Sequence, residues 1–488
     1  MKVKALAGVL LWAAVTTLIF DARVGALALL ASAAVAVLLS SRRDPVAFLT
    51  VAVCLLLLMP ARLRLAGLGA IGTPASLAGL FALVLWAAHR LRVGGAPLFR
   101  QQPVHWPVAL FLVSVVASFA AAFFRGPDAL ETAAADRGLF TALCSAGLAL
   151  YAADRLTDAE RLRTLVRRIV AAGAVMASLG VIQFAVGVDL VAGLAVPGFN
   201  TLVSDWNNLR SGFSRISSTA EHPIELSVVL AMLLPLALHV ARNETGSKRW
   251  VWWGCVVLIG AALPMTVSRT SVVAVGVVLF VIGLRSSWPE RRRGLKWILA
   301  FLVLFRLAVP GLLGTLRSLF SNAGQDDSVG ARVIDYAFVA RFIDQRPLFG
   351  RGFATFLPSR YAFLDNQMLL SLVETGFLGL IAVLTVFLTG VSLGFGTRRR
   401  SPDPELQGLG HALAAALLAA LVTSLTYDSL SFGTGRGLTF LFLGMAGACW
   451  RLAQEPATDR LRPGSHSADL SQVVPTPLKS TSHQVSGS

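Results

Sequence analysis

Charged residues are scarce in this chain of 488 residues, since Asp, Glu, Lys and Arg make up 14% of it while hydrophobic residues make up 55%. The mean hydropathy is +0.70. Soluble globular domains carry about 25% charged residues, so this composition excludes a soluble class. Backbone polar groups inside a bilayer must be hydrogen-bonded within their own segment. Repeated apolar runs of roughly 20 residues therefore predict transmembrane helices.

Cysteine is also scarce, with four residues in the whole chain. Cys54, Cys144, Cys255 and Cys449 all lie inside apolar runs and far apart in the sequence. A disulfide framework or a metal site would need cysteines that can come together in a polar setting. We therefore interpret these four as small packing residues.

Lysine is rare compared with arginine, since the chain has five lysines and 38 arginines and a net charge of +17. Basic residues retained in cytoplasmic loops, together with anionic lipid headgroups, account for this charge. The sequence contains no nucleic-acid-binding motif. We therefore expect membrane lipids, and no nucleic acid, among the partners.

Fourteen apolar runs follow one another along the chain. They lie at residues 5–20, 24–40, 46–59, 75–90, 106–124, 138–153, 169–187, 224–241, 250–267, 269–284, 295–313, 367–395, 410–426 and 432–450. This pattern predicts an all-α, polytopic transmembrane helical bundle of about 12–14 spans over residues 1–453. Residues 454–488 are rich in Ser, Thr and Pro, and we expect them to form a disordered cytoplasmic tail.

Basic clusters set the expected orientation, because Lys and Arg in short loops are retained in the cytoplasm. The clusters SRRD at 41–44, ERRRGLK at 290–296 and RRR at 398–400 all fall on one side of the predicted bundle. This assignment places both termini in the cytoplasm. It also places two long loops, 188–223 and 314–366, on the outer side.

The second outer loop is rich in arginine. It contains Arg317, Arg332, Arg341, Arg346, Arg351 and Arg360. A guanidinium binds phosphate oxygens through two parallel hydrogen bonds, so these residues are suited to a lipid diphosphate. Ordinary ion pairs with the five aspartates of the same loop are an equally open interpretation.

Two further stretches carry arginines near the outer side. In SGFSRISSTAEHPIEL, Arg215 precedes Glu221 and His222, and the following proline favours a helix start. In LPMTVSRTS, Arg269 lies at the turn between two spans, where a charge is costly unless it has a partner or a function. His222 fits a role at the helix start at least as well as a role in catalysis.

The order and spacing of these stretches resemble the O-antigen ligase and polymerase superfamily of bacterial envelope glycosyltransferases, roughly over residues 165–450. The resemblance implies a GT-C-like, all-helical glycosyltransferase of the cytoplasmic (inner) membrane that needs no metal and no cofactor. Its donor would be a glycan on undecaprenyl diphosphate, and its acceptor a hydroxyl of a glycan or lipid on the outer face. Both a polymerase and a ligase fit this description.

The resemblance also implies roles for individual residues. Arg215 and Arg269 match family arginines that look like diphosphate or glycan ligands, while Arg332 and Arg351 match less sharply defined arginines of the long loop. No Asp-x-Asp motif occurs in either long loop, which argues against a metal-dependent glycosyltransferase.

One pair of residues departs from the family pattern. In the ligases the loop ends in a His-Asn pair whose histidine is thought to activate the acceptor hydroxyl, whereas this chain has Asp365 and Asn366. A carboxylate can accept the same proton, because a general base needs reach and a suitable pKa. We therefore predict Asp365 as the catalytic base of an inverting transfer, with Glu221, His222 and Asn366 as supporting candidates.

Glu374 lies in the span that follows, about two and a half turns beyond Asp365. Pairing with an arginine, lining the acceptor entrance and a structural ion pair all remain open for it. Two other classes of protein also remain open. A transporter of lipid-linked oligosaccharide would bind diphosphate too, but should carry charges through many spans. A non-catalytic assembly factor would not need Asp365 and the arginines to converge.

Overall fold

The computed structural model describes residues 44–66, 68, 71–93, 102–191, 198–201, 209–210, 212–321, 336 and 338–454. The predicted spans 5–20 and 24–40, Arg332 and the predicted tail from residue 455 lie outside these residues. Within them the chain is nearly all α-helical, which confirms the predicted fold class.

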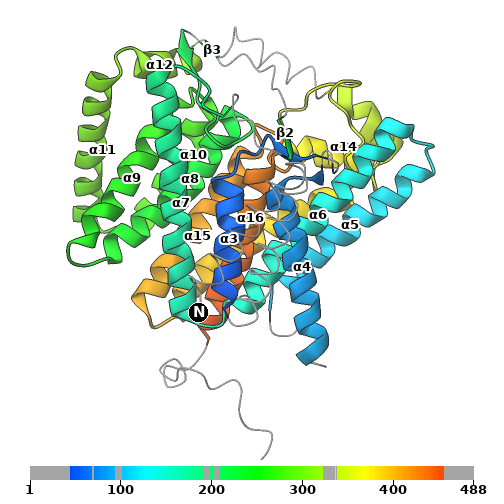
Figure 1. The fold of residues 1–488 in the computed structure, drawn as a ribbon, viewed down its shortest axis with the longest axis horizontal. Coiled ribbons are helices and arrows are strands. Elements are labelled where there is room, and N and C mark those ends of the chain that lie inside the picture. The colour runs from blue at the N-terminus through cyan, green and yellow to red at the C-terminus, as the bar shows by residue number, and fades with distance from the viewer. Residues whose placement is uncertain are drawn as a thin grey trace, which may run out of the picture.

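Long helices dominate the architecture (Figure 1). They are α3 (Pro45–Leu57), α4 (Pro74–Val93), α5 (His105–Phe123), α6 (Ala129–Arg155), α7 (Ala159–Val186), α8 (Pro223–Asn243), α9 (Lys248–Met265), α10 (Arg269–Arg285), α11 (Trp288–Ala308), α12 (Leu312–Ser321), α14 (Gln367–Arg400), α15 (Pro404–Thr423) and α16 (Gly433–Leu452). Each predicted span from 46–59 to 432–450 overlaps one of these helices, and 295–313 continues past the end of α11 into α12.

Several helix ends follow from local sequence signals. The Asp158 side chain accepts a hydrogen bond from the Arg161 amide and so caps the start of α7. Pro223 is the first residue of α8, a position where its missing N–H has no intrahelical partner to lose. Gly187 ends α7 in the left-handed conformation at φ 73°, which glycine adopts without steric cost.

The core of the bundle lies around α8 and α16, which are buried along most of their length. Figure 1 shows α16 near the middle of the molecule, beside α3 and α15, with α5 and α6 on one side and α9 and α11 on the other. Small residues allow close contacts, as between α4 and α6, where a Cβ on Gly147 would lie 2.2 Å from the Gly79 carbonyl oxygen.

Six of the described helices are long and apolar enough to cross a membrane, namely α4, α5, α7, α8, α14 and α15. The helices α11 and α12 add a bent pair, with an angle of 109° at the break. The predicted span 295–313 therefore ends early, at Ala308, because Pro310 and the positive φ of 92° at Gly311 interrupt the helix. Phe305 is the one buried residue of α11.

Two short antiparallel pairs organise the first long loop. Strand β1 (Leu63–Leu65) pairs with β2 (Phe199–Thr201), and β3 (Leu209–Arg210) pairs with β4 (Phe213–Ser214). The pairing of β1 with β2 attaches loop 188–223 to the segment between α3 and α4. This attachment brings residues from the first part of the chain to the candidate site.

The predicted span 367–395 contains a break that the apolar pattern did not predict. Within α14, Gly376 has φ 65° and ψ −165°, which is not helical. The next two amides, of Phe377 and Leu378, donate to the carbonyls of Pro347 and Leu348 at 2.8 and 3.3 Å. A Cβ on Gly376 would lie 2.4 Å from the Leu348 carbonyl oxygen, so glycine is required here.

Candidate active site

Four chain segments meet at one end of the bundle. The Ala61 amide donates to the Thr219 carbonyl at 2.8 Å, which joins the segment after α3 to the segment before α8. The Gln367 amide donates to the Ser424 carbonyl at 2.8 Å, and the Leu430 amide donates to the Gln367 Oε1 at 2.8 Å. The start of α14 and the turn between α15 and α16 are therefore held together.

The two arginines predicted as donor ligands, Arg215 and Arg269, meet at the turn between α9 and α10. Arg215 Nε donates to the Thr266 carbonyl at 3.1 Å, and Arg269 is the first residue of α10, three residues later. The intervening Val267 has φ 47°, a left-handed conformation that marks a tight turn between α9 and α10. The structure thus brings these two arginines to the same turn.

His222 and Asn366 both cap helices. His222 Nδ1 accepts a hydrogen bond from the Ile224 amide at 3.1 Å at the start of α8. Burial, with the positive charges of Arg215 and Arg62, lowers the pKa of His222 to about 4. Asn366 Oδ1 accepts from the Met368 and Leu369 amides at 2.9 and 3.2 Å at the start of α14. His222 therefore acts as a neutral helix cap.

Three acidic side chains lie in one neighbourhood of this site. Asp365 is half-buried, directly before the cap of α14, and Glu221 directly precedes the cap of α8. Burial, together with the negative charges of Asp365 and Glu221, raises the pKa of Asp428, in the turn between α15 and α16, to about 7. Asp365 and Glu221 are predicted from the sequence, whereas Asp428 is not.

Arg351, predicted as a donor ligand, lies in an ion-pair cluster at the tip of α5 and α6. Its Nη2 donates to Glu131 Oε1 at 2.8 Å, and its guanidinium carbon lies 4.2 Å from the centroid of the Tyr361 ring. Arg125 Nη2 donates to the other oxygen of Glu131 at 2.5 Å. Arg351 thus attaches the second long loop to α6.

Glu374 is 7% exposed and contacts the backbone of the same loop. Its Oε1 accepts a hydrogen bond from the Phe356 amide at 3.2 Å, and its own carbonyl accepts from Ser118 Oγ at 2.7 Å. Of the roles left open for Glu374, the structure therefore favours a structural one, in which the carboxylate anchors the loop to α14.

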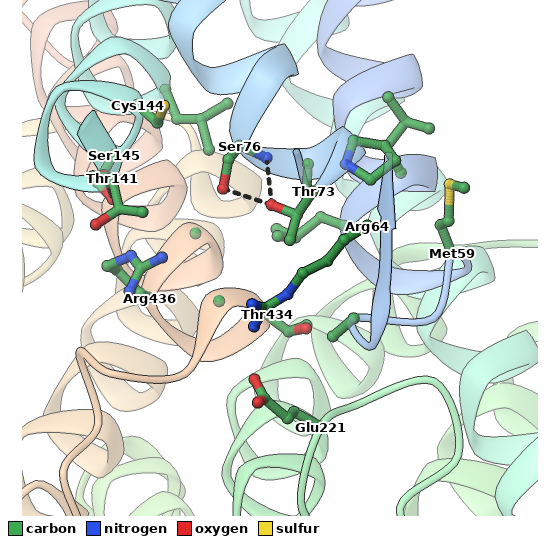
Figure 2. Close-up of a pocket in the computed structure, with 18 of the residues that line it drawn as sticks. Met59, Arg64, Thr73, Ser76, Thr141, Cys144, Ser145, Glu221, Thr434 and Arg436 are labelled. Atoms are coloured by element: carbon green, nitrogen blue, oxygen red, sulfur yellow. Dashed lines mark hydrogen bonds between the residues drawn. The ribbon is translucent and has the colours of Figure 1, made fainter. Parts of the chain in front are cut away.

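A polar cavity of about 140 Å³ lies between α3, α4, α6 and α16. Arg64 from β1, Arg436 from the first turn of α16, and Glu221 line it, together with side-chain hydroxyls from α4, α6 and α16. Figure 2 shows the Arg64 side chain extending across the cavity, with Glu221 below it and Arg436 on the opposite wall. These hydroxyl-bearing residues are Thr73 and Ser76 at the start of α4, Thr141 and Ser145 of α6, and Ser431 and Thr434 at the start of α16.

The charges around this cavity are only partly compensated. Burial raises the pKa of Glu221, against the lowering effect of Arg64, Arg436 and Arg62. Burial also lowers the pKa of Arg64, whose Nε is buried without a hydrogen-bond partner in the described part of the chain. Arg436 donates to the Leu430 carbonyl at 2.5 Å and forms no ion pair with a carboxylate among the described residues. The nearby Glu225 instead accepts from the Thr434 and Gly435 amides.

Arg64 and Arg436 are not among the residues predicted from the sequence, although each carries a signal. Arg64 lies in PARLRLAG, after a span whose following loop should be external, so it runs against the retention of basic residues in the cytoplasm. Arg436 is a charge inside the predicted span 432–450, where a charge marks a function or a partner.

Residues 254–384, from α9 into α14, match the family model described as O-antigen ligase. This segment is similar to O-antigen ligases. The O-antigen ligase match contains Arg269, Arg351, Asp365 and Glu374, while Arg215 precedes it. It confirms the resemblance predicted from the sequence. A comparison with curated proteins finds no match.

The O-antigen ligase match, together with the apolar helices, indicates a multi-pass membrane glycosyltransferase of the ligase or polymerase type. Such an enzyme acts on a lipid-linked glycan donor and an acceptor in the membrane. No group of three His, Cys, Asp or Glu side chains that could hold a metal ion occurs among the residues that the structure describes.

Proposed function

We propose that this protein transfers a glycan from undecaprenyl diphosphate to an acceptor hydroxyl on the outer face of the cytoplasmic membrane. The observation that carries the proposal is the meeting of Arg215 with the turn that precedes Arg269, because Arg269 lies inside the O-antigen ligase match. Two guanidinium groups from separate loops can bind the two phosphates of such a carrier through charge-assisted hydrogen bonds.

The proposed reaction needs few groups. The acceptor oxygen attacks the anomeric carbon, its proton passes to Asp365, and the bond between the anomeric carbon and the diphosphate oxygen breaks. The diphosphate leaves with the undecaprenyl chain, and attack from the opposite face inverts the anomeric configuration. Arg215 and Arg269 stabilise the negative charge that develops on the leaving group, as preorganised donors do in other active sites. No step uses a metal.

The first prediction concerns sidedness and follows from the basic clusters. A reactive tag placed in loop 314–366 should be labelled by an impermeant reagent in intact cells, whereas a tag placed after Arg451 should be labelled only after permeabilisation. If the tag after Arg451 were labelled in intact cells and the loop tag were not, the proposed site would lie in the cytoplasm. It would then have no access to a donor on the outer face.

The second prediction tests the function itself. Deleting the gene should shorten or remove a surface glycan and cause lipid-linked intermediates to accumulate. Arg215→Lys and Arg269→Lys retain the charge but lose the planar fork, so each should restore transfer about tenfold less well than the wild type. Arg92→Lys, an exposed arginine at the end of α4, is the matched control.

Two outcomes would contradict this proposal. Full restoration of the glycan by both lysine variants would exclude the diphosphate role of Arg215 and Arg269. If the purified protein moved the donor lipid across vesicle membranes without consuming it in the presence of acceptor, it would be a transporter.

A further inference from the structure

The transfer proposed above assigns no role to Arg64 or Arg436, which line the polar cavity together with Glu221. Arg64, Arg436 and Glu221 all lie outside residues 254–384. We propose that this cavity is a subsite for an acidic sugar of the glycan, a pyranose ring that carries one carboxylate. The proposal rests on the function proposed above, because its ligand is part of the transferred glycan or of the acceptor.

Ion pairing distinguishes these two arginines from their neighbours. Arg62 pairs with Asp189 at 2.7 Å, Arg125 and Arg351 pair with Glu131, and Arg360 pairs with Asp128. Arg64 and Arg436 form no such pair within the described residues, although both line the polar cavity. A partly buried charge without a counter-charge is destabilising, which favours a site that an external anion completes.

The charge of the cavity fits a single carboxylate. Among the residues that line the cavity, two guanidinium groups and the Glu221 carboxylate leave one net positive charge, which a monoanion neutralises. A sugar diphosphate ester carries two negative charges and would leave the cavity negative. A guanidinium also matches the geometry of a carboxylate, with two parallel hydrogen bonds.

The remaining wall of the cavity fits a sugar ring. The hydroxyls of Thr141 and Ser145 already donate to backbone carbonyls, and Thr73 donates to Ser76. Their oxygens keep lone pairs that can accept hydrogen bonds from the hydroxyls of a pyranose. A volume of about 140 Å³ holds several water molecules, and so gives room for one ring that displaces them. An isoprenyl chain would offer no charge to the two guanidinium groups and no hydrogen bond to these oxygens.

The carbonyls of Leu430 and Ser431 fix the position of Arg436 through hydrogen bonds of 2.5 and 3.4 Å to its Nη1. The loss of side-chain entropy on binding is therefore reduced, because this guanidinium is held before a ligand arrives. Arg64 approaches from the strand β1, so the two arginines can bind opposite edges of one carboxylate-bearing ring.

Binding to the purified full-length protein in detergent tests the proposal. Saturation-transfer NMR would compare glucuronic acid with glucose, which has the same ring without the carboxylate. We expect glucuronic acid to bind about tenfold or more tightly than glucose. Arg64→Gln and Arg436→Gln should each weaken glucuronic acid binding about tenfold or more, while the exposed control Arg92→Gln leaves it unchanged.

A variant that binds glucuronic acid more tightly would separate recognition of the carboxylate from an effect of misfolding. Glu221→Gln keeps the shape and the hydrogen-bonding capacity of the side chain but removes a negative charge from the cavity. Glucuronic acid should therefore bind more tightly to Glu221→Gln than to the wild type. Unchanged or weaker binding would contradict the charge matching on which the proposal depends.

Other outcomes would overturn the proposal. Equal binding of glucose and glucuronic acid would exclude recognition of the carboxylate, as would wild-type binding by both arginine variants. If inorganic pyrophosphate displaced glucuronic acid and its own binding were lost in Arg64→Gln, the cavity would be a diphosphate site. Transfer of neutral glycans without binding of glucuronic acid would refute the subsite alone. Binding of glucuronic acid without any glycan transfer would refute the proposed transfer alone.

Discussion

Asp365→Asn should lower the rate of glycan transfer by about 10²- to 10⁴-fold, which is the usual contribution of a general base. The substitution removes the proton acceptor and nearly preserves the shape of the side chain. The donor lipid should still bind, so unreacted lipid-linked intermediate should accumulate. Purified protein, donor and acceptor in a single-turnover assay would measure the rate of transfer without the effects of export.

Two variants make this test specific. Asp344→Asn removes an exposed carboxylate from the same long loop and should leave the rate of transfer unchanged. Asp365→His restores the pair found in the ligases and should retain part of the activity. Since Asn366 already accepts hydrogen bonds from the first amides of α14, loss of the helix cap would not explain a large effect. Wild-type turnover by Asp365→Asn would move the search for the base to Glu221.

Glu131→Ala should destabilise the folded protein by about 3–5 kcal/mol, because it leaves Arg125 and Arg351 without their shared counter-charge. The Glu131 side chain is 2% exposed, and Tyr361 also donates to it at 2.6 Å. Equilibrium unfolding in detergent micelles would measure the loss. Arg360→Ala breaks an exposed pair with Asp128 and a longer contact of 3.7 Å with Glu131, and should change the unfolding midpoint far less.

The pH dependence of this cluster has a defined sign. Burial alone would raise the pKa of Glu131, but hydrogen bonds from Tyr361, Arg125 and Arg351 lower it below the ordinary value of 4.5. The stabilisation is therefore present at neutral pH and is lost as the pH falls through the lowered pKa. A difference in unfolding free energy between wild type and Glu131→Ala that stays constant down to pH 3 would show that charge is not the cause.

Much of the fold could be predicted because it depends on local composition. Apolar runs located the helices from 46–59 onward, and the proline after His222 correctly indicated a helix start there. The breaks within the helices could not be predicted from the apolar pattern. The break at Gly376 depends on hydrogen bonds to Pro347 and Leu348. Both residues lie outside the apolar run 367–395, which predicts a single span.

The candidate site could be predicted only in part, because distant residues complete it. Glu131 lies 220 residues before its partner Arg351, so no local pattern showed that this arginine was already paired. Arg64 reaches the cavity because β1 pairs with a loop more than a hundred residues later, at Thr201. The roles of Asp365, Arg215 and Arg269 in transfer stay predictions.

The break in α14 also affects how the molecule opens. At Gly376 the two amides that follow are bonded to the loop at 347–348 instead of to the helix itself. The second half of α14 therefore cannot satisfy its first N–H groups if the loop leaves. Loop and helix form one cooperative unit, in which solvent reaches those amides only through a shared opening event.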